Sequence, residues 1–163
     1  MRCPPRLGRA GGLAGHNNGT IAYSTSRVLD VRAGNNASVG GLVGVNLGQG
    51  MILASGSTSR AQGGAYSNVG GVAGENAGTI NTGMAWGSVA GGNYSNLGGI
   101  AGVNHANAKI EHSTASGPVI GAYNCSVNGS YCYTSTGATL GGLAGVNFGA
   151  INYSIAASKI DYR

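Results

Sequence analysis

Few residues of this chain have side chains suited to acid–base catalysis. Its 163 residues include four carboxylates, Asp30, Glu75, Glu111 and Asp161. Glycoside hydrolysis usually requires two carboxylates that face one cleft. Asp30 and Asp161 lie near opposite ends of the chain, while Glu75 and Glu111 occupy non-equivalent places in a repeated motif. We therefore expect solvated surface carboxylates and no catalytic pair.

The three histidines do not form a metal-binding pattern. His105 is close in sequence to Glu111 and His112, but no cysteine or carboxylate arrangement completes a zinc-like set, and His16 is far away. Serines are numerous, yet no Gly-x-Ser-x-Gly elbow with triad partners is present. We therefore expect solvent-facing histidines, no metal, no cofactor and no enzymatic activity.

The charge of the chain does not indicate a nucleic-acid-binding protein. Its formal net charge is +5, but Arg2, Arg6 and Arg9 lie before the repeats. The other basic residues are scattered rather than clustered on one stripe, as a nucleic-acid surface would require; they are Arg27, Arg32, Arg60, Lys109, Lys159 and Arg163. No apolar run is long enough for a transmembrane helix, so we expect neither nucleic-acid binding nor membrane insertion.

Any functional residue must be positioned by an internal repeat, which is the main feature of the sequence. The motif Gly-Gly-(Leu/Val/Ile)-(Ala/Val)-Gly occurs at Gly11–Gly15, Gly40–Gly44, Gly70–Gly74, Gly98–Gly102 and Gly141–Gly145. Successive copies start 29, 30, 28 and 43 residues apart, so the last interval contains an insertion. We expect residues 1–9 to lie outside the repeats and residues 10–163 to form one repeat domain.

The repeat predicts an all-β fold, a right-handed single-stranded parallel β-helix of about five coils of 28–30 residues. Runs such as 39–45 and 97–103 have the length of strands, and Gly and Asn separate them. No window has the apolar spacing of a helix. A sandwich or barrel would give each strand different partners, whereas here the same side chain returns at one place in every repeat.

Stacked coils would place equivalent residues in columns about 4.8 Å apart. An Asn column is expected to form a hydrogen-bonded ladder; it contains Asn17, Asn46, Asn76, Asn104 and Asn147. The first interior aliphatic ladder contains Leu13, Leu42, Val72, Ile100 and Leu143. The second contains Ile21, Ile52, Ile80, Ile110 and Ile151. Glycines beside the first ladder should allow backbone bends and close approach.

Residues 120–139 form the insertion, which is the most individual segment of the chain. It contains Cys125 and Cys132, and both a disulfide-closed loop and two free thiols are compatible with their spacing. Its tyrosines, Tyr123, Tyr131 and Tyr133, are candidate contact residues, because loops on rigid scaffolds often bind partners. The alternative is a tolerated surface insertion without a ligand.

Two further tyrosine positions recur in the repeats. Tyr66 and Tyr94 each stand four residues before a motif, and Tyr23 and Tyr153 share another position. Stacked tyrosines could contact sugar rings, but cross-strand stacking also stabilises a sheet face without any ligand. We interpret these tyrosines as structural.

The strings GGLVGVNLG (Gly40–Gly48), GGVAGENAGTI (Gly70–Ile80) and GGLAGVNFGAI (Gly141–Ile151) resemble the GLUG motif. GLUG repeats occur in filamentous haemagglutinin-like adhesins, in autotransporter-type exoproteins and in non-catalytic parts of surface IgA proteases. The resemblance covers about residues 10–160, but the chain lacks the His-Glu-x-x-His zinc motif of the proteases.

This resemblance implies a segment of a larger secreted or cell-surface bacterial protein, with a structural or adhesive role. Its partners would be glycans or proteins of host or neighbouring cells, and its ends would stack on further repeats of a longer chain. The alternatives are a fragment of a β-helical polysaccharide lyase or glycosidase, or the spacer domain of a surface protease.

Overall fold

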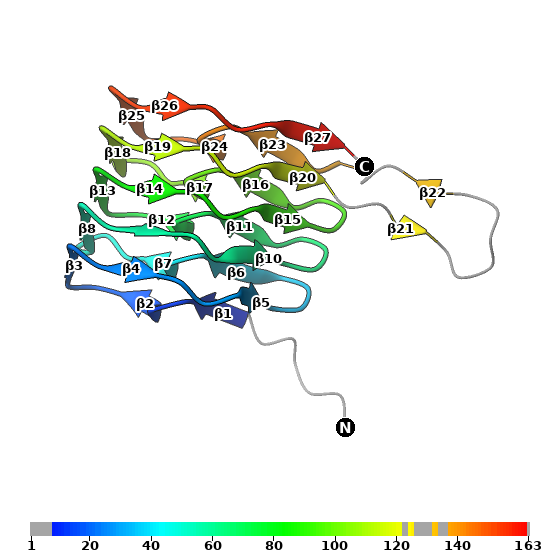
Figure 1. Ribbon diagram of the computed structural model, residues 1–163, viewed down its shortest axis with the longest axis horizontal. Helices are drawn as coiled ribbons and strands as arrows, with labels where there is room; N and C mark the ends of the chain where they lie inside the picture. Colours follow the sequence, from blue (N-terminus) through cyan, green and yellow to red (C-terminus); the bar gives the residue numbers. More distant parts are fainter. Residues whose placement is uncertain (1–7, 122–123, 126–131, 134–136, 163) are drawn as a thin grey trace.

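The computed structural model describes residues 8–121, 124–125, 132–133 and 137–162. In these residues the only regular elements are β-strands, which form five parallel five-stranded sheets and one two-stranded antiparallel pair. Figure 1 shows the coils stacked one on another, with the N-terminal coil (blue) at one end and the C-terminal coil (red) at the other. The described part of the chain contains no helix that is long and apolar enough to cross a membrane.

Each coil passes in turn through sheets I to V. Sheet I contains β1 (Gly8–Gly11), β6 (Ala37–Gly40), β11 (Asn68–Gly70), β16 (Asn96–Gly98) and β23 (Thr139–Gly141). Sheet II contains β2 (Ala14–Asn17), β7 (Val43–Asn46), β12 (Ala73–Asn76), β17 (Ala101–Asn104) and β24 (Ala144–Asn147). Sheet III contains β3 (Thr20–Ala22), β8 (Met51–Leu53), β13 (Thr79–Asn81), β18 (Lys109–Glu111) and β25 (Ala150–Asn152).

The other two sheets complete the circuit. Sheet IV contains β4 (Thr25–Ser26), β9 (Gly56–Ser57), β14 (Met84–Ala85), β19 (Thr114–Ala115) and β26 (Ile155–Ala156). Sheet V contains β5 (Asp30–Arg32), β10 (Arg60–Gln62), β15 (Val89–Gly91), β20 (Val119–Gly121) and β27 (Ile160–Tyr162). The antiparallel pair, β21 (Asn124–Cys125) and β22 (Cys132–Tyr133), comes between β20 and β23 in the sequence and lies to one side of the stack (Figure 1).

The strand register confirms the predicted β-solenoid. Every strand of the five sheets pairs in parallel with the equivalent strand of the next repeat, so that Ile52 is opposite Ile80, which is opposite Ile110. One detail of the prediction is wrong. The run 39–45 is not one strand, because its Gly-Gly pair turns the chain from sheet I, where β6 ends at Gly40, into sheet II, where β7 begins at Val43.

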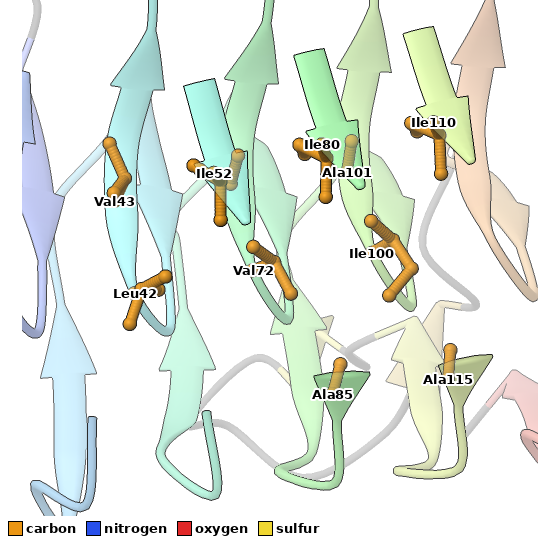
Figure 2. Close-up of a cluster of buried hydrophobic side chains, with 11 residues drawn as sticks. Leu42, Val43, Ile52, Val72, Ile80, Ala85, Ile100, Ala101, Ile110 and Ala115 are labelled. Carbon is orange, nitrogen blue, oxygen red and sulfur yellow. The ribbon is translucent and has the colours of Figure 1, made fainter. Parts of the chain in front are cut away.

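The interior has two apolar clusters. Cluster 1 lies between sheets II, III and IV and includes the buried members of both predicted aliphatic ladders (Figure 2). Its buried residues are Leu42, Val43, Ile52, Val72, Ala73, Ile80, Ala85, Ile100, Ala101, Ile110 and Ala115. Cluster 2 lies between sheets I and V, and its buried residues are Val31, Ala37, Val39, Ala61, Val69, Val89, Leu97 and Val119.

The motif glycines bring the two sides of each coil together between these clusters. In the third coil a Cβ atom on Gly71 would lie 2.6 Å from the Cβ of Ala85 in sheet IV and would overlap the carbonyl oxygen of Gly99. A Cβ on Gly70 would overlap the carbonyl oxygen of Ala73, three residues later. Real Cβ atoms do not approach backbone atoms this closely, so the Gly-Gly bend requires two residues without side chains.

The end coils are less buried than the inner coils, because each has a neighbour on only one side. Leu42, Val72 and Ile100 are fully buried, but Leu13, the first member of the same ladder, is 48% exposed. The prediction that Leu13 is an interior residue is therefore wrong. Ile21, Leu143 and Ile151 are partly buried and pack against cluster 1 from the two ends.

Candidate functional site

The five predicted ladder asparagines form one continuous column at the end of the sheet II strands. The amide Nδ2 of each one donates to the Oδ1 of the next. The donor–acceptor distances along the column are 2.9 Å from Asn17 to Asn46, 2.8 Å from Asn46 to Asn76, 2.8 Å from Asn76 to Asn104, and 2.8 Å from Asn104 to Asn147. All four bonds point from the N-terminal coil toward the C-terminal coil, so the ladder has a direction.

The ladder also holds the turn that follows each sheet II strand. Asn46 Nδ2 lies 3.1 Å from the carbonyl oxygen of Gly50, and Asn76 Nδ2 lies 3.2 Å from that of Lys109 in the next coil. The three inner asparagines are completely buried. A buried amide whose partners are all supplied by the stack stabilises it and fixes its register, because any slip would leave polar groups unsatisfied.

A second polar column closes the corner between sheets III and IV. Ser55 Oγ donates to the carbonyl oxygen of Leu53 at 2.7 Å and accepts from the backbone N–H of Ser24 at 3.0 Å. The corner position is Ser24, Ser55, Gly83, Ser113 or Ser154 in successive coils. The residue before it has a left-handed backbone in every coil; these residues are Tyr23, Ala54, Thr82, His112 and Tyr153. Tyr23 and Tyr153 therefore share a column, at its two ends, and His112 stacks on Tyr153 with ring centroids 5.2 Å apart.

Tyr66 and Tyr94 occupy a corresponding left-handed position before sheet I. Their rings stack with centroids 4.9 Å apart and planes 12° from parallel, although both side chains are about half exposed. Gly137 continues this column, and a Cβ there would lie 2.5 Å from Cδ1 of Tyr94. The inner ring faces thus contact each other and the backbone at Gly137, whereas a sugar ring would need a free aromatic face. This geometry favours a structural role.

We expect replacement of Tyr94 to separate ring stacking from backbone strain. Tyr94→Ala removes the stacked ring and keeps a side chain at φ 56°, so it should lower the free energy of unfolding by about 1 kcal/mol. Tyr94→Gly also removes the ring but relieves the left-handed strain, so it should be more stable than the alanine variant by about 1 kcal/mol. Urea unfolding of the three proteins measures both differences. Equal stability of the two variants would contradict the strain assignment.

Glu75 is a carboxylate with several hydrogen-bond partners. Its Oε1 accepts from Ser38 Oγ in the preceding coil and, at 3.0 Å, from Asn68 Nδ2 in its own coil. Its Oε2 lies 2.9 Å from Nε2 of His105 in the following coil, and only 25% of its side chain is exposed. The predictions of a solvated Glu75 and a lone His105 are therefore wrong, because the stack brings these residues together from three coils.

The pKa of Glu75 lies below its ordinary value. Partial burial raises this pKa, but hydrogen bonds from Ser38, His105 and Asn68, together with the charge of His105, lower it by more. Because the folded pKa is below the unfolded one, the carboxylate stabilises the fold above its unfolded pKa. This contribution disappears as the pH falls through the folded pKa.

We therefore expect Glu75→Gln to lower the free energy of unfolding by about 1 kcal/mol at neutral pH and to have little effect in acid. Urea unfolding at a series of pH values measures the difference between the two proteins. Ser38→Ala removes one of the donors that lower the pKa of Glu75. As the pH falls, the stabilisation by the Glu75 carboxylate should therefore disappear at a higher pH in Ser38→Ala than in the parent protein. A Glu75→Gln effect that is independent of pH would contradict the assignment.

The other three carboxylates, Asp30, Glu111 and Asp161, do not lie together in the described structure. Asp30 and Asp161 lie at opposite ends of sheet V. Asp30 pairs with Arg32, and Asp161 pairs with Lys159. Glu111 lies in sheet III. Arg9 contacts His16 in the first coil. Among the residues that the structure describes, no group of three or more His, Cys, Asp or Glu side chains is placed to hold a metal ion.

The insertion is described only in part. Cys125 is opposite Cys132 and Asn124 is opposite Tyr133 in the register of β21 and β22. Tyr123 and Tyr131 lie outside the described residues. The backbone thus brings the two cysteine positions together, and it places one of the three candidate contact tyrosines on β22.

A further interior column, which was not predicted, lies in sheet V. It contains Val31, Ala61, Val89, Val119 and Ile160. A signal for it was present, because the last four of these residues each follow the ladder isoleucine of their repeat by nine positions. Coil 1 has one more residue in this interval, which leaves Val28 and Leu29 exposed.

A family model described as the GLUG motif matches residues 93–121 of this chain. Comparisons with curated proteins and with solved structures gave no match. The matched segment begins at the turn before β16 and ends with the last residue of β20, so it contains one strand of each sheet. In this protein the GLUG motif therefore corresponds to one complete coil of a β-solenoid.

Proposed function

We propose that this chain is a non-enzymatic structural and adhesive segment of a secreted or surface-exposed bacterial protein. It would act as a rigid β-helical rod that displays its turns and its insertion for attachment to host or neighbouring cells. The observation that supports this proposal most is the continuous asparagine ladder through all five coils. Such a ladder stabilises the stack of coils, since its four amide–amide hydrogen bonds each join one coil to the next.

The distribution of polar groups supports a rod rather than a catalytic pocket. Several buried polar side chains are bonded along the stack, as in the Asn46–Asn76 and Ser26–Ser59 pairs. A repeat scaffold of this kind gains stability from contacts between neighbouring coils, so its outer turns are free to vary in sequence. Surface location is supported by the GLUG match to one coil and by the resemblance of the other repeats to it.

A carbohydrate-active enzyme is the main alternative. That function would require two carboxylates across one cleft. Glu75 lies in sheet II, and the other carboxylates of the described residues are in sheets III and V. Glu75 is also engaged by three donors from its surroundings. These positions favour the structural reading.

Attachment of coated beads tests the proposal. Beads that carry the purified chain should bind to a panel of cell surfaces or immobilised glycans more than beads that carry an unfolded control protein. A variant with Tyr131→Ser and Tyr133→Ser tests whether the insertion contributes, and circular dichroism checks that its fold is intact. Equal attachment of the coated and control beads across the panel would contradict an adhesive role. Release of oligosaccharides from an acidic polysaccharide would instead support the enzyme alternative.

A further inference from the structure

The outer face of sheets IV and V carries an exposed tryptophan in the middle coil of the stack. Trp86 directly follows β14 and is 47% exposed. Its N–H donates to the carbonyl oxygen of Ser57, which places Thr58 beside Trp86 in the second coil. The N–H of Ser116 donates in the same way to Ala85, which places Ser116 beside Trp86 in the fourth coil. The indole ring thus lies between two exposed, short hydroxyl side chains.

This ring is open to a ligand in a way that the stacked tyrosines are not. Tyr66 and Tyr94 cover each other's inner faces, with ring centroids 4.9 Å apart. Trp86 stacks on no ring of the described residues, and its indole N–H has no hydrogen-bond partner among them. An aromatic face is electron-rich, so it attracts the C–H groups on the apolar side of a sugar ring. Trp86 therefore offers the free aromatic face that the tyrosine column lacks.

A basic side chain lies diagonally beside Trp86 on the neighbouring coil. Ala61 is opposite Val89 in the register of sheet V, so Arg60 of the second coil is opposite the residue two places after Trp86. Side chains alternate along a strand, and Ala61 and Ala85 are buried, so Arg60 and Trp86 both point outward. Long side chains at such diagonal positions can reach the same ligand.

The guanidinium of Arg60 is not neutralised by the carboxylate nearest to it in sheet V. Asp30 is opposite Arg60, but Asp30 pairs with Arg32 at 3.2 Å. Arg60 makes no ion pair with any residue that the structure describes. The positive charge beside Trp86 is therefore available to an anion from solution.

The surroundings of this pair are polar and lack a negative charge. In the second to fourth coils the outward positions of sheets IV and V are Gly56, Thr58, Arg60 and Gln62, then Met84, Trp86, Ser88 and Ala90, then Thr114, Ser116, Pro118 and Ile120. One cation and no carboxylate occur among them, so an anionic ligand meets attraction without repulsion on this face. The hydroxyl groups can exchange hydrogen bonds with the hydroxyls of a sugar.

We propose that Trp86 and Arg60 bind a glycan through a sugar unit that carries a carboxylate. The apolar side of the sugar ring packs on the indole, and the carboxylate accepts a forked pair of hydrogen bonds from the planar guanidinium. Thr58 and Ser116 lie at the edge of the ring, where they bond to its hydroxyls. This site rests on the proposed adhesive function, since it names the ligand class that one face of the rod holds.

A nucleic acid fits this face less well than a glycan. Single strands are held by several aromatic rings along a basic track, because successive bases stack and successive phosphates need cations. Sheets IV and V offer one aromatic ring and one unpaired cation in these three coils. A single sugar with one carboxylate matches that pair.

Tryptophan fluorescence tests the site directly, because Trp86 is the one tryptophan of the chain. The probe is a galacturonate oligosaccharide, and its methyl ester is the control, since it has the same sugar rings without the charge. The acid should shift the emission of the parent chain to shorter wavelength and saturate. The ester should bind about fivefold more weakly, because it lacks the carboxylate that Arg60 recognises.

Variants separate the two contributions when binding is measured by calorimetry. Trp86→Ala should raise the dissociation constant of the acid at least about tenfold. Arg60→Gln should bind the acid about fivefold more weakly than the parent does and should no longer distinguish acid from ester. Lys109→Gln removes the same charge from sheet III and should bind like the parent. Circular dichroism checks the fold of each variant.

Three results would overturn the proposal: no emission change with the acid, equal binding of acid and ester by the parent, or tighter binding of a single-stranded oligonucleotide than of the acid. Attachment of the coated beads to cells is a separate measurement. If the beads attach but the chain does not bind the oligosaccharide, this site is wrong and the adhesive function stands. If the chain binds the oligosaccharide as described but the beads attach to no surface, the site stands and the adhesive function is wrong.

Discussion

Replacing Gly71 with alanine should lower the free energy of unfolding by about 3 kcal/mol or more. The new methyl group would overlap the carbonyl oxygen of Gly99 and lie 2.6 Å from the Cβ of Ala85. The first obstacle is backbone of the next coil, which cannot move away as a flexible side chain could. The Gly-Gly bend would have to move away from sheet IV. The neighbouring coils would then no longer be in register with the third coil.

Gly48→Ala is the matched control, because it adds the same methyl group in the second coil. A Cβ on Gly48 has its nearest neighbour, the carbonyl oxygen of Ala77, at 4.0 Å. This variant should unfold within about 0.5 kcal/mol of the parent chain. Thermal and urea unfolding of the two variants measure the difference. If both had the same stability, the close approach of sheets I, II and IV at the motif glycines would be contradicted.

Replacing Asn76 with leucine should lower the free energy of unfolding by about 1–3 kcal/mol. Asn76 is completely buried, accepts from Asn46, and donates to Asn104 and to the carbonyl oxygen of Lys109. The substitution removes three hydrogen bonds and leaves the amide of Asn46 and the Oδ1 of Asn104 without their ladder partner. Leucine is similar in size to asparagine, so the loss of stability comes from the missing hydrogen bonds and not from a change in side-chain volume.

Asn147→Leu provides the comparison within the same ladder. Asn147 is the last member of the column and is exposed, so water can replace its partners. Its replacement should cost less than half as much as that of Asn76, as measured by the urea midpoint of each variant. Equal losses at the two positions, or no loss at either, would contradict the view that burial makes the ladder important for stability.

Much of the fold could be predicted because one physical rule repeats along the chain. Where each repeat forms one coil, residues that share a place in the repeat must share a column, so Ile52, Ile80 and Ile110 could be aligned from spacing alone. The same rule aligned the asparagines and also Tyr66 with Tyr94. Periodicity therefore gives contacts along the axis of the stack.

Contacts within a coil and at its ends do not follow from periodicity. Glu75 meets Ser38 of sheet I and His105, which directly follows β17, and the spacing of the repeats does not show that these side chains turn toward Glu75. Leu13 has the same place in the motif as Leu42 but lacks a coil on one side. The insertion occurs once, so no other repeat supplies a template for it.

Every repeat completes one coil and places like residues in one column. This arrangement can be tested with pairs of spin labels on cysteines introduced in sheet III, in a chain whose own cysteines are replaced by serine. Thr20, Thr79, Lys109 and Ala150 occupy the same column in coils 1, 3, 4 and 5. Distances from Thr20 to the other three should increase by about 5 Å per coil, reaching about 19 Å at Ala150. A label at Ala150 much farther from Thr20, or distances that do not increase in this order, would contradict the solenoid.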